Sequence, residues 1–281
     1  MLPHLTTRTA WLSAAAFFAG SINAVAGGGS LLSFPALLQA GILPIQANAT
    51  NTVALLPGQF TSAAAYRREL RRHHSILLRL LIAAFAGGLL GARLLMGTKQ
   101  EQFVRLVPWL LLTATVLFAA GPPLQKFLSR RTSAEGPLDT ADETITPPVP
   151  AKNDVHPSGL RPLARILLPF CIFIVCLYIG YFGAGAGLLI MGVLSVAGVA
   201  SVNEINALKT VITSVSNTVA SLTFILFGAV LWHYCVLMMA AASLGGYCTA
   251  RVARRRKPKW IRGFIVATGC VVTAYFFWKL H

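Results

Sequence analysis

The chain has 281 residues, of which 56% are hydrophobic and 11% are charged, and its formal net charge is +16. A soluble protein of this composition could not cover its surface with polar side chains, so we expect an integral membrane protein without a sizeable soluble domain. The positive charge does not indicate nucleic-acid binding, because the basic residues form short clusters between apolar runs, as they do beside a membrane.

Apolar runs along the chain predict an all-α polytopic membrane protein, since about 20 mostly apolar residues cross a hydrocarbon core of roughly 30 Å. In chain order the runs cover residues 10–41, 45–66, 75–97, 103–120, 163–199, 205–228, 230–250 and 260–279. The first and fifth runs are too long for one simple span, and both carry glycines near the middle.

The first run contains INAVAGGGSLLSFPALLQAG at residues 22–41, which has three interpretations. They are a signal-peptide cleavage site after Ala26, a phosphate-binding glycine loop and an interrupted membrane helix. Three consecutive glycines, Gly27 to Gly29, favour the interruption, because helix packing requires small residues at helical spacing. A helix that restarts at Ser30 would present unpaired N–H groups and the positive end of its dipole, which attract anions.

A change of composition divides the chain into two halves. Residues 121–162 are rich in Pro, Thr, Asp and Glu and hold five of the eight acidic residues, which predicts a flexible polar linker. We therefore expect residues 1–120 to form a first transmembrane repeat and residues 163–281 a second.

The two halves share a motif at a nearly constant spacing. GGGSLL at residues 27–32 matches AGAGLL at residues 184–189, and NATNTV at residues 48–53 corresponds to NALKTV at residues 206–211. Gln59 then falls opposite Asn217. A removable signal peptide would need no second copy, and GYFGAGAG lacks the strand that precedes a dinucleotide-binding loop, so the repeat favours two interrupted helices.

Two basic clusters predict the orientation of the halves. Residues 67–72 and 251–262 both carry arginines that belong on the cytoplasmic side, yet five apolar runs separate them. An odd number of crossings would place the clusters on opposite sides unless the fifth run forms a hairpin or two arms. If the first run has the same arrangement, the two halves enter the membrane from opposite sides and form an inverted repeat. Each half then has a glycine-broken or re-entrant helix followed by about three spanning helices. This topology predicts that His281 lies outside the cytoplasm.

Polar residues inside the apolar runs are costly and therefore mark candidate functional positions. The candidate substrate-binding residues are Gly28, Gly29, Ser30, Asn48, Asn51, Thr52, Gly185, Gly187, Asn206, Lys209 and Thr210. Lys209 occupies the repeat position of Asn51, and a lysine at the centre of a membrane helix costs roughly 2.5 to 3.5 kcal/mol on insertion scales. It either binds an anion, pairs with Glu204 or extends towards the membrane interface.

Nothing in the sequence favours an enzyme. There is no Ser-His-Asp set, no carboxylate pair within the apolar runs and no nucleotide-binding motif, so we expect no catalytic residues and no cofactor. The five cysteines lack a C-x-x-C pair or a histidine at ligand spacing, which indicates no metal site. We interpret Arg93 and Arg105 as anchors at the membrane boundary.

The sequence AGSINAVAGGGSLLSFPALLQAGILPIQANATNTVALLPG, with its weaker second copy YIGYFGAGAGLLIMGVLSVAGVASVNEINALKTV, resembles the sulfite exporter TauE/SafE family of membrane permeases. The resemblance covers nearly the whole chain outside the linker. It implies a multi-pass secondary transporter of the bacterial inner membrane that moves small anions, particularly sulfur oxyanions or organosulfonates such as sulfite. The long acidic linker and Lys209 depart from the commoner family pattern.

The partners expected for this role are a small anionic substrate, the lipid bilayer, a coupled proton or sodium ion and a second copy of the chain in a homo-oligomer. Two other classes of function remain open. An anion channel would use the same positive helix ends, and a non-transporting membrane scaffold would bind no anion.

Overall fold

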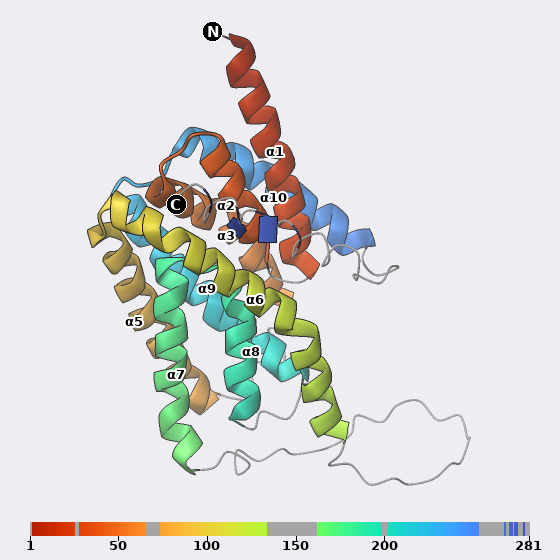
Figure 1. Cartoon of the computed structure of the whole chain (residues 1–281). Helices are drawn as coiled ribbons and strands as arrows, with labels where there is room; N and C mark the ends of the chain where they lie inside the picture. The colour runs from red at the N-terminus through yellow and green to blue at the C-terminus, as the bar shows by residue number, and fades with distance from the viewer. Residues whose placement is uncertain are drawn as a thin grey trace, which may run out of the picture.

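The structure, a computed structural model, describes residues 2–25, 28–65, 74–133, 162–197, 202–252 and isolated positions between 267 and 278. The described residues form nine helices and no strand, which confirms the predicted all-α class (Figure 1). The helices are α1 (Leu2–Val25), α2 (Ser30–Gln39), α3 (Pro44–Ala65), α5 (His74–Gly97), α6 (Gln100–Ser133), α7 (Pro162–Tyr181), α8 (Ala186–Val196), α9 (Val202–Leu226) and α10 (Trp232–Val252).

Both long apolar runs are interrupted at their glycines, as predicted. The first run divides into α1 and α2, and the fifth divides into α7 and α8. Gly185, the residue before α8, has φ 76°, a left-handed conformation that glycine adopts without steric cost. The chain runs along α7 and returns along α8, which packs against it, so this run is a helical hairpin (Figure 1).

The two halves of the chain exchange helices. From the first half, α5 packs against α7 and α9 of the second half, whereas α10 of the second half packs against α1 and α3 of the first. The central helices α3 and α9 also pack against each other. Residues before and after the linker therefore build one helical body instead of two independent ones.

Close backbone contacts hold the exchanged helices in place. Gly87-Gly88 of α5 recurs 158 residues later as Gly245-Gly246 of α10, the same spacing that relates Gln59 to Asn217. A Cβ atom built on Gly91 would overlap the carbonyl oxygen of Leu177 in α7, and one built on Gly245 would overlap that of Phe17 in α1. Small residues permit this approach in membrane helices, where van der Waals packing drives association.

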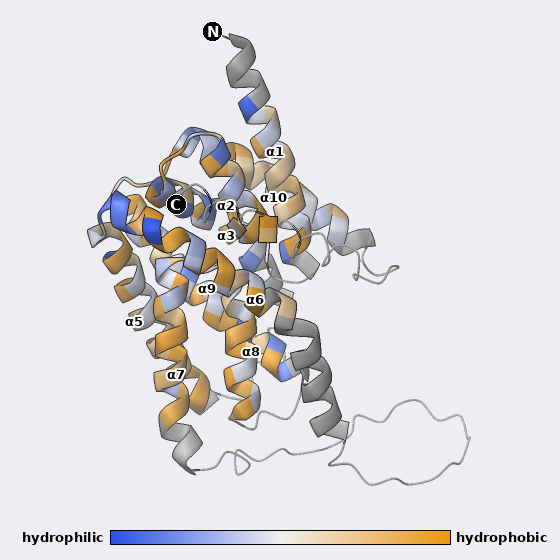
Figure 2. Cartoon of the chain, viewed as in Figure 1, coloured by the Kyte–Doolittle hydropathy of each residue, from blue (hydrophilic) through white to orange (hydrophobic). Residues whose placement is uncertain are grey.

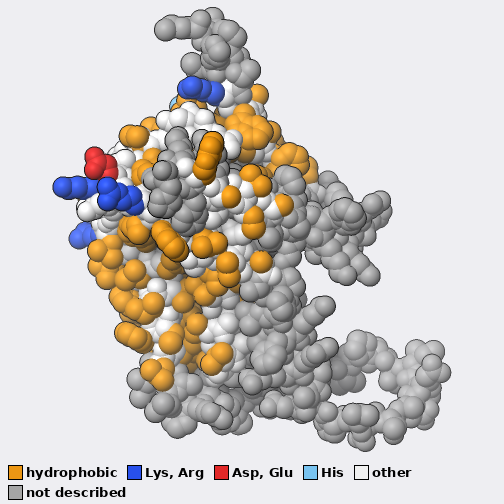
Figure 3. All heavy atoms as spheres, in the orientation of Figure 1, with side chains coloured by type: hydrophobic (Ala, Val, Ile, Leu, Met, Phe, Trp, Pro, Cys, Tyr) orange, Lys and Arg blue, Asp and Glu red, His pale blue; other side chains and the backbone are white. Residues whose placement is uncertain are grey.

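The bundle is apolar outside and partly polar inside, as expected for a protein surrounded by lipid. Large apolar side chains are exposed, including Ile82 at 60% and Trp109 at 60%, while Thr50 and Asn51 are 0% and 1% exposed. Apolar residues lie along most of the helices (Figure 2) and cover the face formed by α5, α6 and α7 (Figure 3). Charged side chains gather at one edge of that face, where α5 is followed by α6.

Few individual helices are apolar enough to be recognised as spans by composition alone. Within the described residues, Ile76–Gly97 is the one segment long and apolar enough to cross a membrane, and three shorter apolar helices are Ser30–Gln39, Leu167–Tyr181 and Ala186–Val196. The interruptions shorten α2 and α8, and the polar side chains of α3 and α9 lower their mean hydropathy.

Several predicted features lie outside the described residues. They include the first basic cluster, most of the second, residues 134–161 of the linker and His281, so the predicted orientation stays a prediction. The helix α6 continues to Ser133 and thus enters the first part of the predicted linker. Apolar Leu124, Phe127 and Leu128 recur there at helical spacing, which favours continuation of the helix.

Replacing Gly91 tests the contact between α5 and α7. We expect Gly91→Ala to destabilise the protein by about 1–3 kcal/mol, because the added methyl group forces the two backbones apart. Gly97→Ala in the same helix is the control, since a Cβ atom there has no heavy atom within 4 Å. Melting temperatures in detergent measure the effect, and equal values for the two variants would contradict this packing.

Candidate functional site

The first group of predicted residues lies where α2 begins beside α3. Gly29 is the N-cap of α2 and supplies no capping side chain, so the first turn begins with Ser30 and without a side-chain partner for its N–H groups. Gly29 also packs against the backbone of Ala19, because a Cβ atom there would overlap the Ala19 carbonyl oxygen. The glycines thus serve both the interruption and the packing of α1 on α2.

Buried polar contacts connect this helix start to α3. The Ser33 hydroxyl donates a hydrogen bond to Asn51 Oδ1, and both residues are at most 1% exposed. Asn48, one turn earlier in α3, donates from Nδ2 to the Tyr181 carbonyl at 3.1 Å. Thr52 donates back to the Asn48 carbonyl at 2.8 Å, so its proton is used within α3. Asn48 thereby joins the first half to the end of α7.

The second interruption is held in a fixed shape by its aromatic residues. The Tyr178 hydroxyl donates to the Ala184 carbonyl at 2.8 Å. Phe182 packs edge-on against Phe34 of α2, with ring centroids 5.2 Å apart. The loop between α7 and α8 therefore touches the start of the first-half site.

The second group of predicted residues surrounds Lys209 on α9. Its Nζ lies 3.4 Å from Asn206 Oδ1 and 3.9 Å from the Met191 sulfur. A Cβ atom built on Gly187 would lie 3.6 Å from Lys209 Cδ, so the lysine stem runs along the first turn of α8. Thr210 donates to the Asn206 carbonyl at 2.7 Å. The structure thus places the Lys209 stem along the first turn of α8 and its ammonium between Asn206 and Met191.

The two groups have equivalent contacts with different chemistry. Ser33 bonds to Asn51 across 18 residues of sequence, and Met191 contacts Lys209 across the same separation. Each contact joins the short helix after an interruption to the helix that follows it. The first half thus has a neutral hydrogen bond between Ser33 and Asn51, where the second half has the half-buried ammonium of Lys209 beside Met191.

The central helices cross at an amide pair. Asn217 Nδ2 donates to Gln59 Oε1 at 2.9 Å, and Thr50 Oγ1 accepts from the backbone N–H of Leu231 at 3.0 Å. Because Leu231 follows the end of α9, α3 and α9 run in opposite directions. No hydrogen bond between described residues joins Asn48 or Asn51 directly to Asn206 or Lys209, and the loop between α7 and α8 connects the two groups instead.

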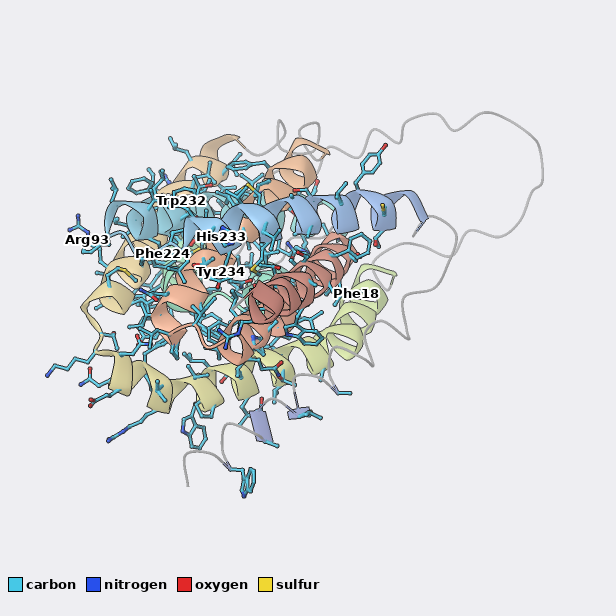
Figure 4. All side chains as sticks on the ribbon, turned by 90° about the horizontal axis from the view of Figure 1, so that it is seen from above. Phe18, Arg93, Phe224, Trp232, His233 and Tyr234 are labelled. Carbon is cyan, nitrogen blue, oxygen red and sulfur yellow. The ribbon has the colours of Figure 1, made fainter. Side chains whose placement is uncertain are left out.

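Other polar candidates lie outside these groups. Arg93 and Arg105 are exposed, and Arg93 points away from the helices in Figure 4. His233 is exposed at the start of α10, where its ring stacks edge-on with that of Tyr234. These side chains do not contribute to the site.

Sequence reasoning missed Ser33 and the backbone carbonyl of Tyr181. Ser33 is the second hydroxyl residue after the first glycine cluster, so its position inside an apolar run was the available indication. The role of the Tyr181 carbonyl depends on the tertiary approach of α3 to α7 and has no local sequence pattern.

The family described as sulfite exporter TauE/SafE matches residues 12–276 of this chain. A probable membrane transporter protein, ORF9 of Sinorhizobium sp., is 31% identical over 261 residues, which cover 92% of this chain and 87% of the relative. Probable membrane transporter proteins of Haemophilus influenzae and of Escherichia coli (YfcA) are each 25% identical, over 92% and 95% of this chain and 90% and 88% of the relatives. No solved structure matches this chain.

The family match spans both interrupted helices, both groups of polar residues and the amide pair between them. The relatives at this level of coverage are named as membrane transporters, which agrees with the apolar exterior and the polar interior of the bundle. The chain therefore belongs to the sulfite exporter TauE/SafE family of membrane transporters.

Proposed function

We propose that this protein is a multi-pass secondary transporter of small anions in the bacterial inner membrane, with sulfur oxyanions such as sulfite, or organosulfonates, as its substrate class. The observation that carries the proposal is the position of Lys209 along the first turn of α8. The lysine stem lies along this turn and its ammonium lies between Asn206 and Met191, near a helix whose N-cap, Gly185, has no capping side chain.

The charges at this position favour an anion. A helix N-terminus carries roughly +0.5 of an elementary charge, and its first N–H groups have no partner within the helix. The Lys209 ammonium adds a second positive potential near this turn, so a cation is disfavoured. Ionisable groups inside a membrane protein commonly lie on substrate pathways, because their retention there is costly.

Neutral donors near the first interruption suit the several oxygens of an oxyanion. The amide groups of Asn48 and Asn51 and the N–H groups around Gly28, Gly29 and Ser30 lie next to the loop that leads to Gly187 and Lys209. The anion passes between these groups during transport. Its gradient, the membrane potential or a coupled proton or sodium ion drives the flux.

The proposed architecture is an inverted repeat whose halves exchange roles during alternating access. The packing of α10 on α1 corresponds to the packing of α5 on α7, and α3 and α9 run in opposite directions. The amide pair supports this proposal further, because Gln59 and Asn217 occupy corresponding positions of the two halves. Corresponding residues touch one another only beside a two-fold axis.

Replacing Lys209 tests the anion site. We expect Lys209→Met to reduce sulfite uptake into proteoliposomes by about tenfold or more, because a charged hydrogen bond contributes roughly 1.5–3 kcal/mol. Lys209→Arg keeps the charge and should retain part of the activity. Arg93→Met, which removes an exposed cation, is the matched control.

The proposal fails if Lys209→Met and Asn48→Ala both transport sulfite at the rate of the unmodified protein. Discrete single-channel currents carried by the anion in planar bilayers would instead identify a channel. Absence of any anion flux or binding would indicate a membrane scaffold.

The amide pair is tested by a double-mutant cycle. Gln59→Leu and Asn217→Leu should each destabilise the protein by about 1 kcal/mol, because each leaves the other, partly buried amide without its partner. The double variant should lose much less stability than the sum of the losses of the two single variants. Thermal unfolding in detergent measures all four proteins, and strictly additive losses would rule out a direct contact at the proposed axis.

A further inference from the structure

One buried hydroxyl near the candidate site has no hydrogen-bond partner. Thr115 of α6 is 3% exposed, and its Oγ1 atom has no partner in the described part of the chain. Buried polar groups in native proteins are nearly always satisfied, so an orphaned one requires an explanation.

Several other threonines in the described helices satisfy their hydroxyl groups within their own helix. Each donates to the carbonyl four residues earlier, at distances of 2.7 to 2.9 Å, as found for Thr52, Thr98, Thr113, Thr210 and Thr223. Thr115 has the carbonyl of Leu111 at that position and does not use it. Its proton therefore remains available to a group that is not part of the bundle.

Ala114, the residue before Thr115 in α6, lies beside the start of α8. The buried face of α6 contains Leu111, Ala114 and Thr115, and the helix packs against α8, α3 and α2. The three atoms nearest to a Cβ atom built on Gly185 all belong to Ala114, the closest being its carbonyl oxygen at 3.1 Å. Figure 1 shows α6 passing along α8 in this region.

The remaining orphaned polar atoms lie elsewhere. They belong to Gln100 at the first turn of α6, Ser195 near the end of α8 and Ser221 one turn beyond Asn217. None of these residues is next to Ala114, the residue that contacts Gly185. Thr115 is thus the orphaned hydroxyl that follows directly on the residue in contact with Gly185, the N-cap of the helix along which the Lys209 stem lies.

We propose that Thr115 is a further substrate-binding residue, whose hydroxyl donates a hydrogen bond to an oxyanion held between the start of α8 and Lys209. This inference rests on the proposed anion transport. The anion would then be surrounded by three kinds of donor: the ammonium of Lys209 in α9, backbone N–H groups of α8 and the hydroxyl of Thr115 in α6. The same residue type recurs 158 residues later as Thr273, which is 5% exposed, so the corresponding position of the second half is also a buried threonine.

The test replaces the hydroxyl by a methyl group of similar size. We expect Thr115→Val to raise the KM for sulfite in proteoliposomes by about tenfold, as the loss of one hydrogen bond to a charged group does. Its melting temperature without anion should be unchanged or higher, because the variant buries no unsatisfied hydroxyl. Thr115→Ser, which keeps the donor, should retain an almost unchanged KM.

Thr113→Val is the matched control, because Thr113 lies on the exposed face of the same helix and donates to the Trp109 carbonyl at 2.8 Å. Sulfite and thiosulfate are the probes, with thermal shifts of the purified protein as a second readout. A Thr115→Val protein that melts lower or fails to fold would show a structural role and overturn the inference.

The outcomes also separate this inference from the proposed function. If the unmodified protein responds to sulfite or thiosulfate and Thr115→Val responds equally, the role of Thr115 is wrong while anion transport stands. If the unmodified protein neither transports nor binds either anion, both proposals are overturned.

Discussion

Every interrupted helix inside a membrane leaves backbone groups that lipid cannot satisfy, and this constraint organises the protein. Both interruptions are enclosed by other helices: α1 and α3 surround the start of α2, while α6, α7 and α9 surround the start of α8. The close glycine contacts that join α5 to α7 and α10 to α1 hold this enclosure together. The short helices α2 and α8 can therefore begin in the interior of the bundle, where lipid does not reach them.

The enclosure explains why polar chemistry gathers at the two helix starts. Asn48 uses the Tyr181 carbonyl at the end of α7, Ser33 pairs with Asn51, and Lys209 lies against the first turn of α8. Each contact either satisfies the freed backbone or adds donors beside it. The equivalent positions carry an amide in one half and a cation in the other, so the two halves have similar geometry but different charges.

The sequence predicted the features that follow from local pattern. Consecutive glycines predicted the interruption between α1 and α2, while the repeat and the number of crossings between the basic clusters predicted the one between α7 and α8. The repeat spacing also aligned Gln59 with Asn217, which are in contact. Contacts that depend on which helices meet could not be derived. The bond from Asn48 to Tyr181 and the approach of Ala114 to Gly185 require the tertiary pairing of distant segments, because neither has a periodic or compositional mark.

The proposed oxyanion site lies beside Lys209, near the start of α8. Selenite, the heavier analogue of sulfite, allows a direct test, because selenium can be located by its anomalous scattering in crystals of the full chain. We expect a selenium site within hydrogen-bonding reach of Lys209 Nζ and near the first turn of α8, and its loss in crystals of Lys209→Met. Saturable binding with the selenium elsewhere in the molecule, or an unchanged selenium site in the variant, would rule out this position for the oxyanion.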